Sequence, residues 1–176
     1  MNLESFRTLI GEPRLRHDVD ADWTEFENDF DVRLPMDYKA FVSSYGPCIL
    51  GDELVLFHPR APAGPDAADL RWKVESHVYA YESMREWHPQ SIDFVAYPQA
   101  GGYFPIGHNH MGVGWLVAVE GAEHANGPVL LDYGADQREL DMPFLEVLYR
   151  GLRGEFNGEI FSDTAVENPT YQLLWP

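Results

Sequence analysis

The chain has 176 residues, of which 45% are hydrophobic and 14% aromatic, so it can bury a globular core and is not disordered as a whole. It carries 29 acidic residues against 12 basic ones, a formal net charge of -17, and this charge repels nucleic acid and anionic membranes. The same charge either attracts a basic protein or only keeps the chain in solution, and composition does not choose between the two.

Cysteine usage and the N-terminal segment indicate the compartment. The single cysteine, Cys48, excludes a disulfide within the chain, which suits a reducing environment. Residues 1–10 include Glu4 and Arg7 and have neither the apolar region nor the cleavage site of a signal peptide. No run approaches the roughly eighteen apolar residues that a membrane span needs. We therefore expect one cytoplasmic domain over residues 1–176.

The N-terminal part predicts two short helices. The first, over 2–10 and ending at Gly11, is predicted by apolar residues at helical spacing: Leu3, Phe6, Leu9 and Ile10. Asp22 is a suitable N-cap for the second, over 23–30, with aromatic residues on one side: Trp23, Phe26 and Phe30. Its other side is acidic and is expected to face solvent: Glu25, Glu27, Asp29 and Asp31.

The stretch 32–46, VRLPMDYKAFVSSYG, carries the clearest helix signals in the chain. Pro35 suits the first helical position, and Asp37 lies in the first turn, where the helix dipole favours a carboxylate. Gly46 and Pro47 stop the helix. Apolar side chains at helical spacing predict a core-packing helix that needs no catalytic group: Tyr38, Ala40, Phe41 and Tyr45.

Two short strands and a long helix are predicted next. The strands cover 48–50 and 54–57, and residues 58–65 form a surface loop rich in proline and glycine. The helix covers 69–87 and is ended by Pro89. Its buried stripe is expected to hold Leu70, Val74, Val78, Tyr81 and Met84, widened by Trp72 and Tyr79.

The second half is rich in strand-forming segments. Residues 92–97 are β-prone, and 103–106 predict a strand at an edge because they include Pro105. Residues 114–120 and 129–133 predict an antiparallel hairpin, and 138–140 a further short strand. Asp141 is the expected N-cap of a closing helix over 142–153 that ends at Gly154. The apolar tail, 155–176, is expected to dock on the body or on a second copy.

Helices that flank a run of strands with mostly short connections imply an α+β domain with a single mixed, largely antiparallel β-sheet. No internal repeat or interdomain linker is present.

These motifs resemble the signature of the SUKH superfamily, in the branch named for the fungal Smi/Knr cell-wall synthesis regulator. The resemblance covers about residues 21–154 and implies the same α+β fold. Pro47 and Cys48 depart from it, because the family often has a second glycine soon after the tyrosine-glycine pair. The matching residues are Trp23, Phe26, Leu34, Pro35, Asp37, Tyr38, Phe41, Tyr45, Gly46, the segments 104–107 and 128–129, Phe144 and Leu148.

Candidate residues for chemistry form no recognisable site. His108 and His110 lie at alternate positions and could share a metal with Glu120, His124 or Asp132, but the spacing matches no metal signature, and an exposed polar turn after Gly107 explains them better. The possible nucleophiles lie in no nucleophile elbow and have no patterned base: Ser43, Ser44 and Cys48. We therefore expect no catalytic residue, metal or cofactor, and a protein that is not an enzyme.

Three functions are compatible with these observations. The resemblance and the -17 charge favour a protein-binding module, an immunity protein that neutralises a basic, nuclease-type toxin of a bacterial polymorphic toxin system. Its expected contacts lie at acidic turns: Asp52, Glu53, Glu120 and Glu123. The alternatives are an intracellular regulatory scaffold, as the fungal relatives imply, and a small-ligand or metal-binding domain that uses His108 and His110. A monomer and a homodimer are both compatible with the sequence.

Overall fold

The structure is a computed structural model that describes residues 2–15, 20–62, 68–88, 90, 92–119 and 127–174. Its helices are α1 (Leu3–Ile10), α2 (Asp20–Asp29), α3 (Met36–Tyr45), α4 (Leu70–Trp87), α5 (Phe144–Leu152) and α6 (Asp163–Glu167). Its strands are β1 (Cys48–Leu50), β2 (Leu54–Leu56), β3 (Tyr103–Asn109), β4 (Gly114–Ala118), β5 (Val129–Asp132), β6 (Gln137–Leu140) and β7 (Tyr171–Leu173). The α+β class with a single sheet is confirmed.

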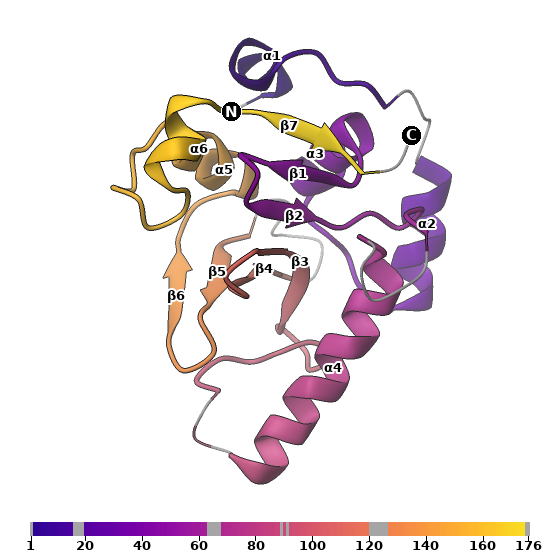
Figure 1. Ribbon diagram of the computed structural model, residues 1–176. Coiled ribbons are helices and arrows are strands. Elements are labelled where there is room, and N and C mark those ends of the chain that lie inside the picture. The colour runs from indigo at the N-terminus through magenta and orange to yellow at the C-terminus, as the bar shows by residue number, and fades with distance from the viewer. Residues whose placement is uncertain are drawn as a thin grey trace.

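The seven strands form one open sheet in the order β6-β5-β4-β3-β2-β1-β7 (Figure 1). Each neighbouring pair of these strands is antiparallel. The predicted hairpin is confirmed, because Trp115 pairs with Leu131 and Val117 with Val129. The tail docks on the body, where Ile49 of β1 pairs with Gln172 of β7.

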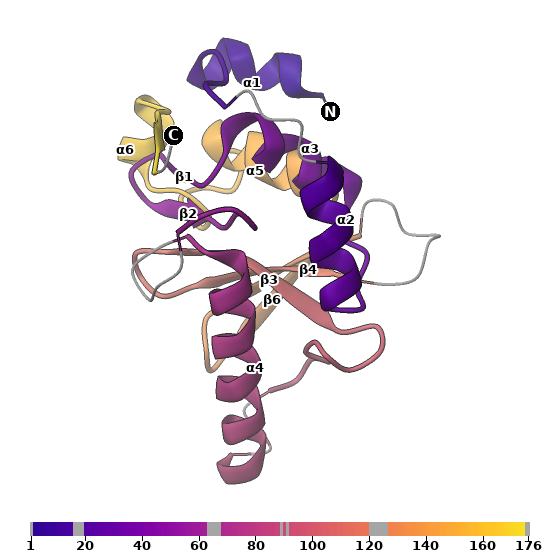
Figure 2. The same ribbon diagram turned by 90° about the vertical axis from the view of Figure 1, so that its right-hand side faces the viewer.

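The two faces of the sheet bury different cores. Figure 2 shows α1, α3 and α5 stacked on one side of the sheet and α4 on the other. Side chains alternate along a strand, so Trp115 and Leu131 join the large core beneath the stacked helices, whereas Leu116 and Leu130 join a small cluster with Tyr81 of α4. The side of the sheet that faces α4 therefore has the thinner cover.

Asp37 joins two helices that are far apart in sequence. Pro143 occupies the N-cap position of α5 and offers no side-chain acceptor. The carboxylate of Asp37 supplies the missing acceptor, because its Oδ2 accepts a hydrogen bond from the Leu145 amide of α5 at 2.9 Å. Its Oδ1 accepts a second hydrogen bond from the Tyr38 amide, at 2.9 Å. The expectation that Asp141 caps this helix is wrong, because α5 begins three residues later, at Phe144, and Asp141 is exposed.

Pro105 lies in the central strand of the sheet, so the prediction of an edge strand is wrong. The position tolerates proline because β2 ends at Leu56, opposite Gly107, and leaves Pro105 with a ladder partner on the β4 side alone. A register shift between Pro105 and Gly107 loosens the ladder at the same place. The missing N–H therefore interrupts no pairing with β2.

Other predictions differ from the structure for local reasons. Helix α2 begins at Asp20, so Asp22 lies inside it and not at its cap. Glu27 is buried and does not face solvent, since its carboxylate accepts a hydrogen bond from the Leu34 amide at 2.8 Å and pairs with Lys39 at 2.7 Å. Residues 92–97 form no strand beyond a single bridge at Ala96.

Candidate functional site

Asp52 and Glu53 lie in the tight turn between β1 and β2. Asp52 is exposed and has a positive φ of 58°, a conformation that aspartate tolerates better than most residues. Glu53 turns back onto the protein: its carboxylate accepts hydrogen bonds from the backbone amide of Ser162, at 3.1 Å, and from the Ser162 hydroxyl. Ser162 is the N-cap of α6, so Glu53 also anchors that helix.

A pocket of about 560 Å³ opens beside Glu53, where several loops at one end of the sheet converge. Glu53 and His110 supply polar groups from the turns around β2 and β3, and residues 158–162 close one side. Two large side chains at this pocket stand in solvent: Met111 is 75% exposed and Tyr133 42% exposed. Acidic and exposed apolar groups therefore lie together next to the predicted contact turn.

The predicted contacts Glu120 and Glu123 lie outside the described residues. The chain leaves β4 at Val119, whose amide donates to the Gly102 carbonyl at 3.2 Å. This point is beside Tyr103, the first residue of β3, whereas Glu53 lies near the other end of that strand, where Leu54 pairs with Asn109. The described part of the chain thus brings Asp52 and Glu53 together but does not bring Val119 to them.

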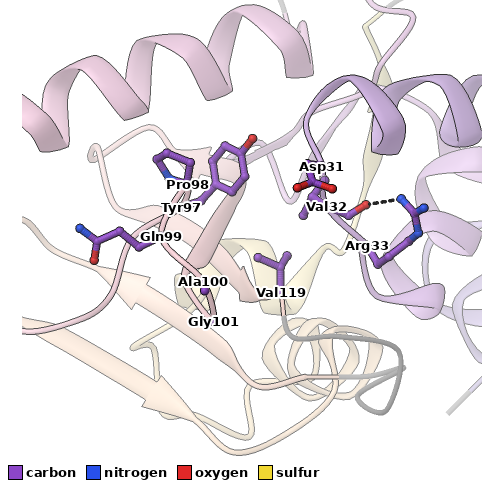
Figure 3. Close-up of a pocket in the computed structure, with 9 residues that line it drawn as sticks. All are labelled: Asp31, Val32, Arg33, Tyr97, Pro98, Gln99, Ala100, Gly101 and Val119. Atoms are coloured by element: carbon purple, nitrogen blue, oxygen red, sulfur yellow. Dashed lines mark hydrogen bonds between the residues drawn. The ribbon is translucent and has the colours of Figure 1, made fainter.

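A second pocket, of about 430 Å³, lies between the residues that follow α2 and the 97–101 segment (Figure 3). Asp31 and the ring of Tyr97 face one another across it, while Arg33 turns outward and donates to the Val32 carbonyl at 2.8 Å. Burial raises the pKa of Tyr97, and the charge of Asp31 raises it further, so the phenol stays neutral. The Tyr97 hydroxyl donates to the Phe30 carbonyl, so the pocket offers a ligand the aromatic ring for packing and the exposed Asp31 carboxylate as a hydrogen-bond acceptor.

His108 and His110 have separate surroundings. His108 is a residue of β3, so the expected turn directly after Gly107 is wrong, and its ring lies 5.3 Å from that of Phe57. Burial lowers the pKa of His108, and Lys73 and His77 lower it further. His110 is exposed, and its backbone amide donates to the Glu53 carbonyl at 3.0 Å. Among the described residues no group of three His, Cys, Asp or Glu side chains is placed to hold a metal ion.

The possible nucleophiles have structural contacts. The Ser43 hydroxyl accepts from the Trp23 indole at 2.9 Å, and the Ser44 hydroxyl donates to the Ala40 carbonyl at 3.1 Å. Cys48 is fully buried, and burial raises the pKa of its thiol, so the prediction of a buried thiol is confirmed.

The sequence did not lead us to predict an exposed tyrosine on α4. Tyr79 was expected in the buried stripe of α4, yet it is 74% exposed. The helical pattern carried a usable signal, because Glu75 and Glu82 lie four and three positions from Tyr79 and mark that face as polar.

The fold and these surfaces define an acidic α+β protein with pockets suited to binding. The family model of the SMI1 / KNR4 family (SUKH-1) matches residues 20–143, and the chain belongs to this family. The family includes immunity proteins, and its members are generally non-catalytic immunity or regulatory proteins. Comparisons with curated proteins and with solved structures found no match. Among the helices described, none has both the length and the apolar character needed to cross a bilayer.

Proposed function

We propose that this protein is an immunity protein that binds and neutralises a basic, nuclease-type toxin in the cytoplasm of the cell that makes it. The net charge of -17 on a chain of this family is the observation that carries the proposal. A toxin that acts on nucleic acid needs a positive surface, because attraction to phosphate supplies most of its affinity. An acidic inhibitor covers that surface without performing any chemistry.

The charge also sets how the two proteins meet. Surfaces of opposite charge steer the two proteins together and raise the association rate well above that of neutral proteins. At physiological ionic strength, salt largely screens the attraction between charges that are more than about 8–10 Å apart. Fast capture suits a protective role, because a toxin molecule that stays free continues to cut its substrate.

We propose the turn of Asp52 and Glu53 as one contact with the toxin, with Glu120 and Glu123 as further contacts. Asp52 is the sharper test because it is exposed, whereas the Glu53 carboxylate also holds Ser162. The exposed Met111 and Tyr133 at the neighbouring pocket would add apolar area to a contact made through this turn.

The experiment pairs the protein with a candidate toxin domain encoded next to it. Co-expression is expected to rescue cells from the toxin, and purified proteins are expected to bind with an affinity that falls as salt rises from 50 to 300 mM. Asp52→Asn, which keeps a residue that tolerates a positive φ, is expected to slow association, and Asp93→Asn is the matched control because Asp93 is an exposed loop residue that does not line the pocket beside Glu53. Absence of binding at low and moderate salt would overturn the proposal. Binding to a signalling or cell-wall enzyme instead would support the regulatory alternative.

A further inference from the structure

A shallow apolar groove of about 320 Å³ runs along α4, between this helix, the residue that follows α2 and the 97–98 segment. We call it the α4 groove. It is lined by Val74 and Val78 of α4, by Phe30 after α2, and by Tyr97 and Pro98. Tyr97 and Pro98 also line the 430 Å³ pocket of Figure 3, so the two concave regions share a wall. Figure 2 shows α4 extending away from the sheet and the stacked helices.

Tyr79 stands at the edge of the groove with 74% of its surface exposed. Glu75 and Glu82 are also exposed and line the same groove, and their spacing from Tyr79 puts the three side chains on one face of α4. An exposed tyrosine at an apolar groove is the kind of side chain that dominates binding energy in protein interfaces. The carboxylates of Glu75 and Glu82 beside Tyr79 would favour a partner segment with positive charge.

The two basic residues that precede Glu75 on α4, Arg71 and Lys73, both contact other groups. The Lys73 ammonium lies over the rings of Phe57 and Trp72, 5.7 and 5.2 Å from their centroids. Arg71, one turn before Glu75, binds the Asp29 carboxylate at 2.7 Å. Its guanidinium also lies over the rings of Phe26 and Phe30, 5.4 and 5.7 Å from their centroids. Arg71 therefore ties α4 to α2. The described residues that line the groove include Glu75 and Glu82 but no lysine or arginine, so its rim is acidic.

Charge complementarity decides between the possible occupants. A second copy of this chain would carry the same net charge of -17, and like charges brought together at an interface are costly. A basic protein would pair its lysine or arginine side chains with these carboxylates while an apolar side chain fills the groove.

We propose that the α4 groove docks a segment of a basic protein partner in which an apolar side chain is flanked by lysine or arginine. Tyr79 packs on the apolar side chain, and Glu75 and Glu82 pair with the basic ones. The identity of the partner as a toxin rests on the function proposed above, whereas the place of contact does not.

The first experiment measures binding of the toxin domain to Tyr79→Ala and Glu82→Gln. Trp87→Ala is the matched control, because Trp87 is an aromatic residue of the same helix, is also 74% exposed, and does not line the groove. We expect about a 30-fold loss of affinity for Tyr79→Ala, a smaller loss for Glu82→Gln that shrinks at high salt, and no change for Trp87→Ala. Unfolding by urea should match the wild type in all three variants, since these side chains are exposed.

A second experiment separates the two proposals. An 18-residue amphipathic peptide of leucine and lysine is titrated against the protein, with a leucine–glutamate peptide as its control. If the toxin domain does not bind the wild type, the immunity function fails, but selective binding of the lysine peptide that Tyr79→Ala weakens still supports the groove. If the toxin domain or the lysine peptide binds and Tyr79→Ala has no greater effect than Trp87→Ala, the groove proposal is overturned. Absence of binding by both probes overturns it as well.

Discussion

Asp37 is predicted to stabilise the protein from a distance in sequence, by capping a helix that begins more than a hundred residues later. Asp37→Ala removes the acceptor of the Leu145 amide and leaves this part-buried N–H without its partner. Loss of a helix cap costs about 1 kcal/mol, and an unsatisfied buried donor costs about 1–3 kcal/mol. Burial raises the pKa of the Asp37 carboxyl, so the ionised group is itself held at a cost, and relief of that cost offsets part of the loss.

The net effect expected for Asp37→Ala is a loss of about 2 kcal/mol in the free energy of unfolding. For a chain of this size that corresponds to a fall in Tm of about 4–8 °C. Asp37→Asn keeps one oxygen acceptor but not two, and is expected to lose about half as much. Urea unfolding followed by circular dichroism measures both, provided that the dependence on urea concentration is unchanged.

Asp141→Ala is the control, because the local sequence predicts Asp141 as the cap of α5 and the structure assigns that role to Asp37. Asp141 is exposed, so its replacement is expected to change the free energy of unfolding by less than about 0.5 kcal/mol. The reasoning is refuted if Asp37→Ala is as stable as the wild type, or if Asp141→Ala loses as much stability as Asp37→Ala.

Three further predictions concern pH, backbone geometry and thiol chemistry. Burial raises the pKa of Asp37, so the folded protein holds the proton of this carboxyl more tightly than the unfolded chain does. The wild type should therefore lose stability relative to Asp37→Asn as the pH rises from the ordinary aspartate pKa through the raised one. Urea unfolding at a series of pH values measures this, and a change in the opposite direction would contradict it. Gly51→Ala should cost about 1–3 kcal/mol more than Gly112→Ala in thermal unfolding, because both glycines have positive φ but only at Gly51 would a Cβ meet the Ala165 methyl, at 2.7 Å. Cys48 should react with a thiol reagent only as fast as the protein opens, because it is buried and burial raises its pKa; rapid labelling of the native protein would count against that.

Much of the fold was predictable because its signals are local. Proline, an acidic first turn and Gly46 mark the two ends of α3 in the sequence. The helix lies where it was predicted, except that Pro35 is its N-cap and Met36 its first residue. The hairpin of β4 and β5 was equally clear, because buried strands near in sequence have few other partners to pair with. In this chain Pro35 and Asp37 meet the same local requirements, and Asp37 also makes one distant contact, with the Leu145 amide.

The candidate binding surfaces were only partly predictable. Asp52 and Glu53 were recognisable as turn residues, but no motif indicates that Glu53 also holds the start of α6 or that Met111 and Tyr133 lie beside it. Pockets form where loops from distant parts of the chain come together, and local sequence patterns do not predict which loops these are.

The amino-acid sequence by itself determined the charge, the family and most of the helices and strands, because composition and short-range periodicity are properties of neighbouring residues. Only the tertiary structure decided that Asp37 caps α5 and that Pro105 can lie in the central strand. Each of these depends on which distant segment fills the space around the residue: Asp37 and Leu145 are 108 positions apart, and a carboxylate can cap any helix whose first turn the fold brings within hydrogen-bonding distance.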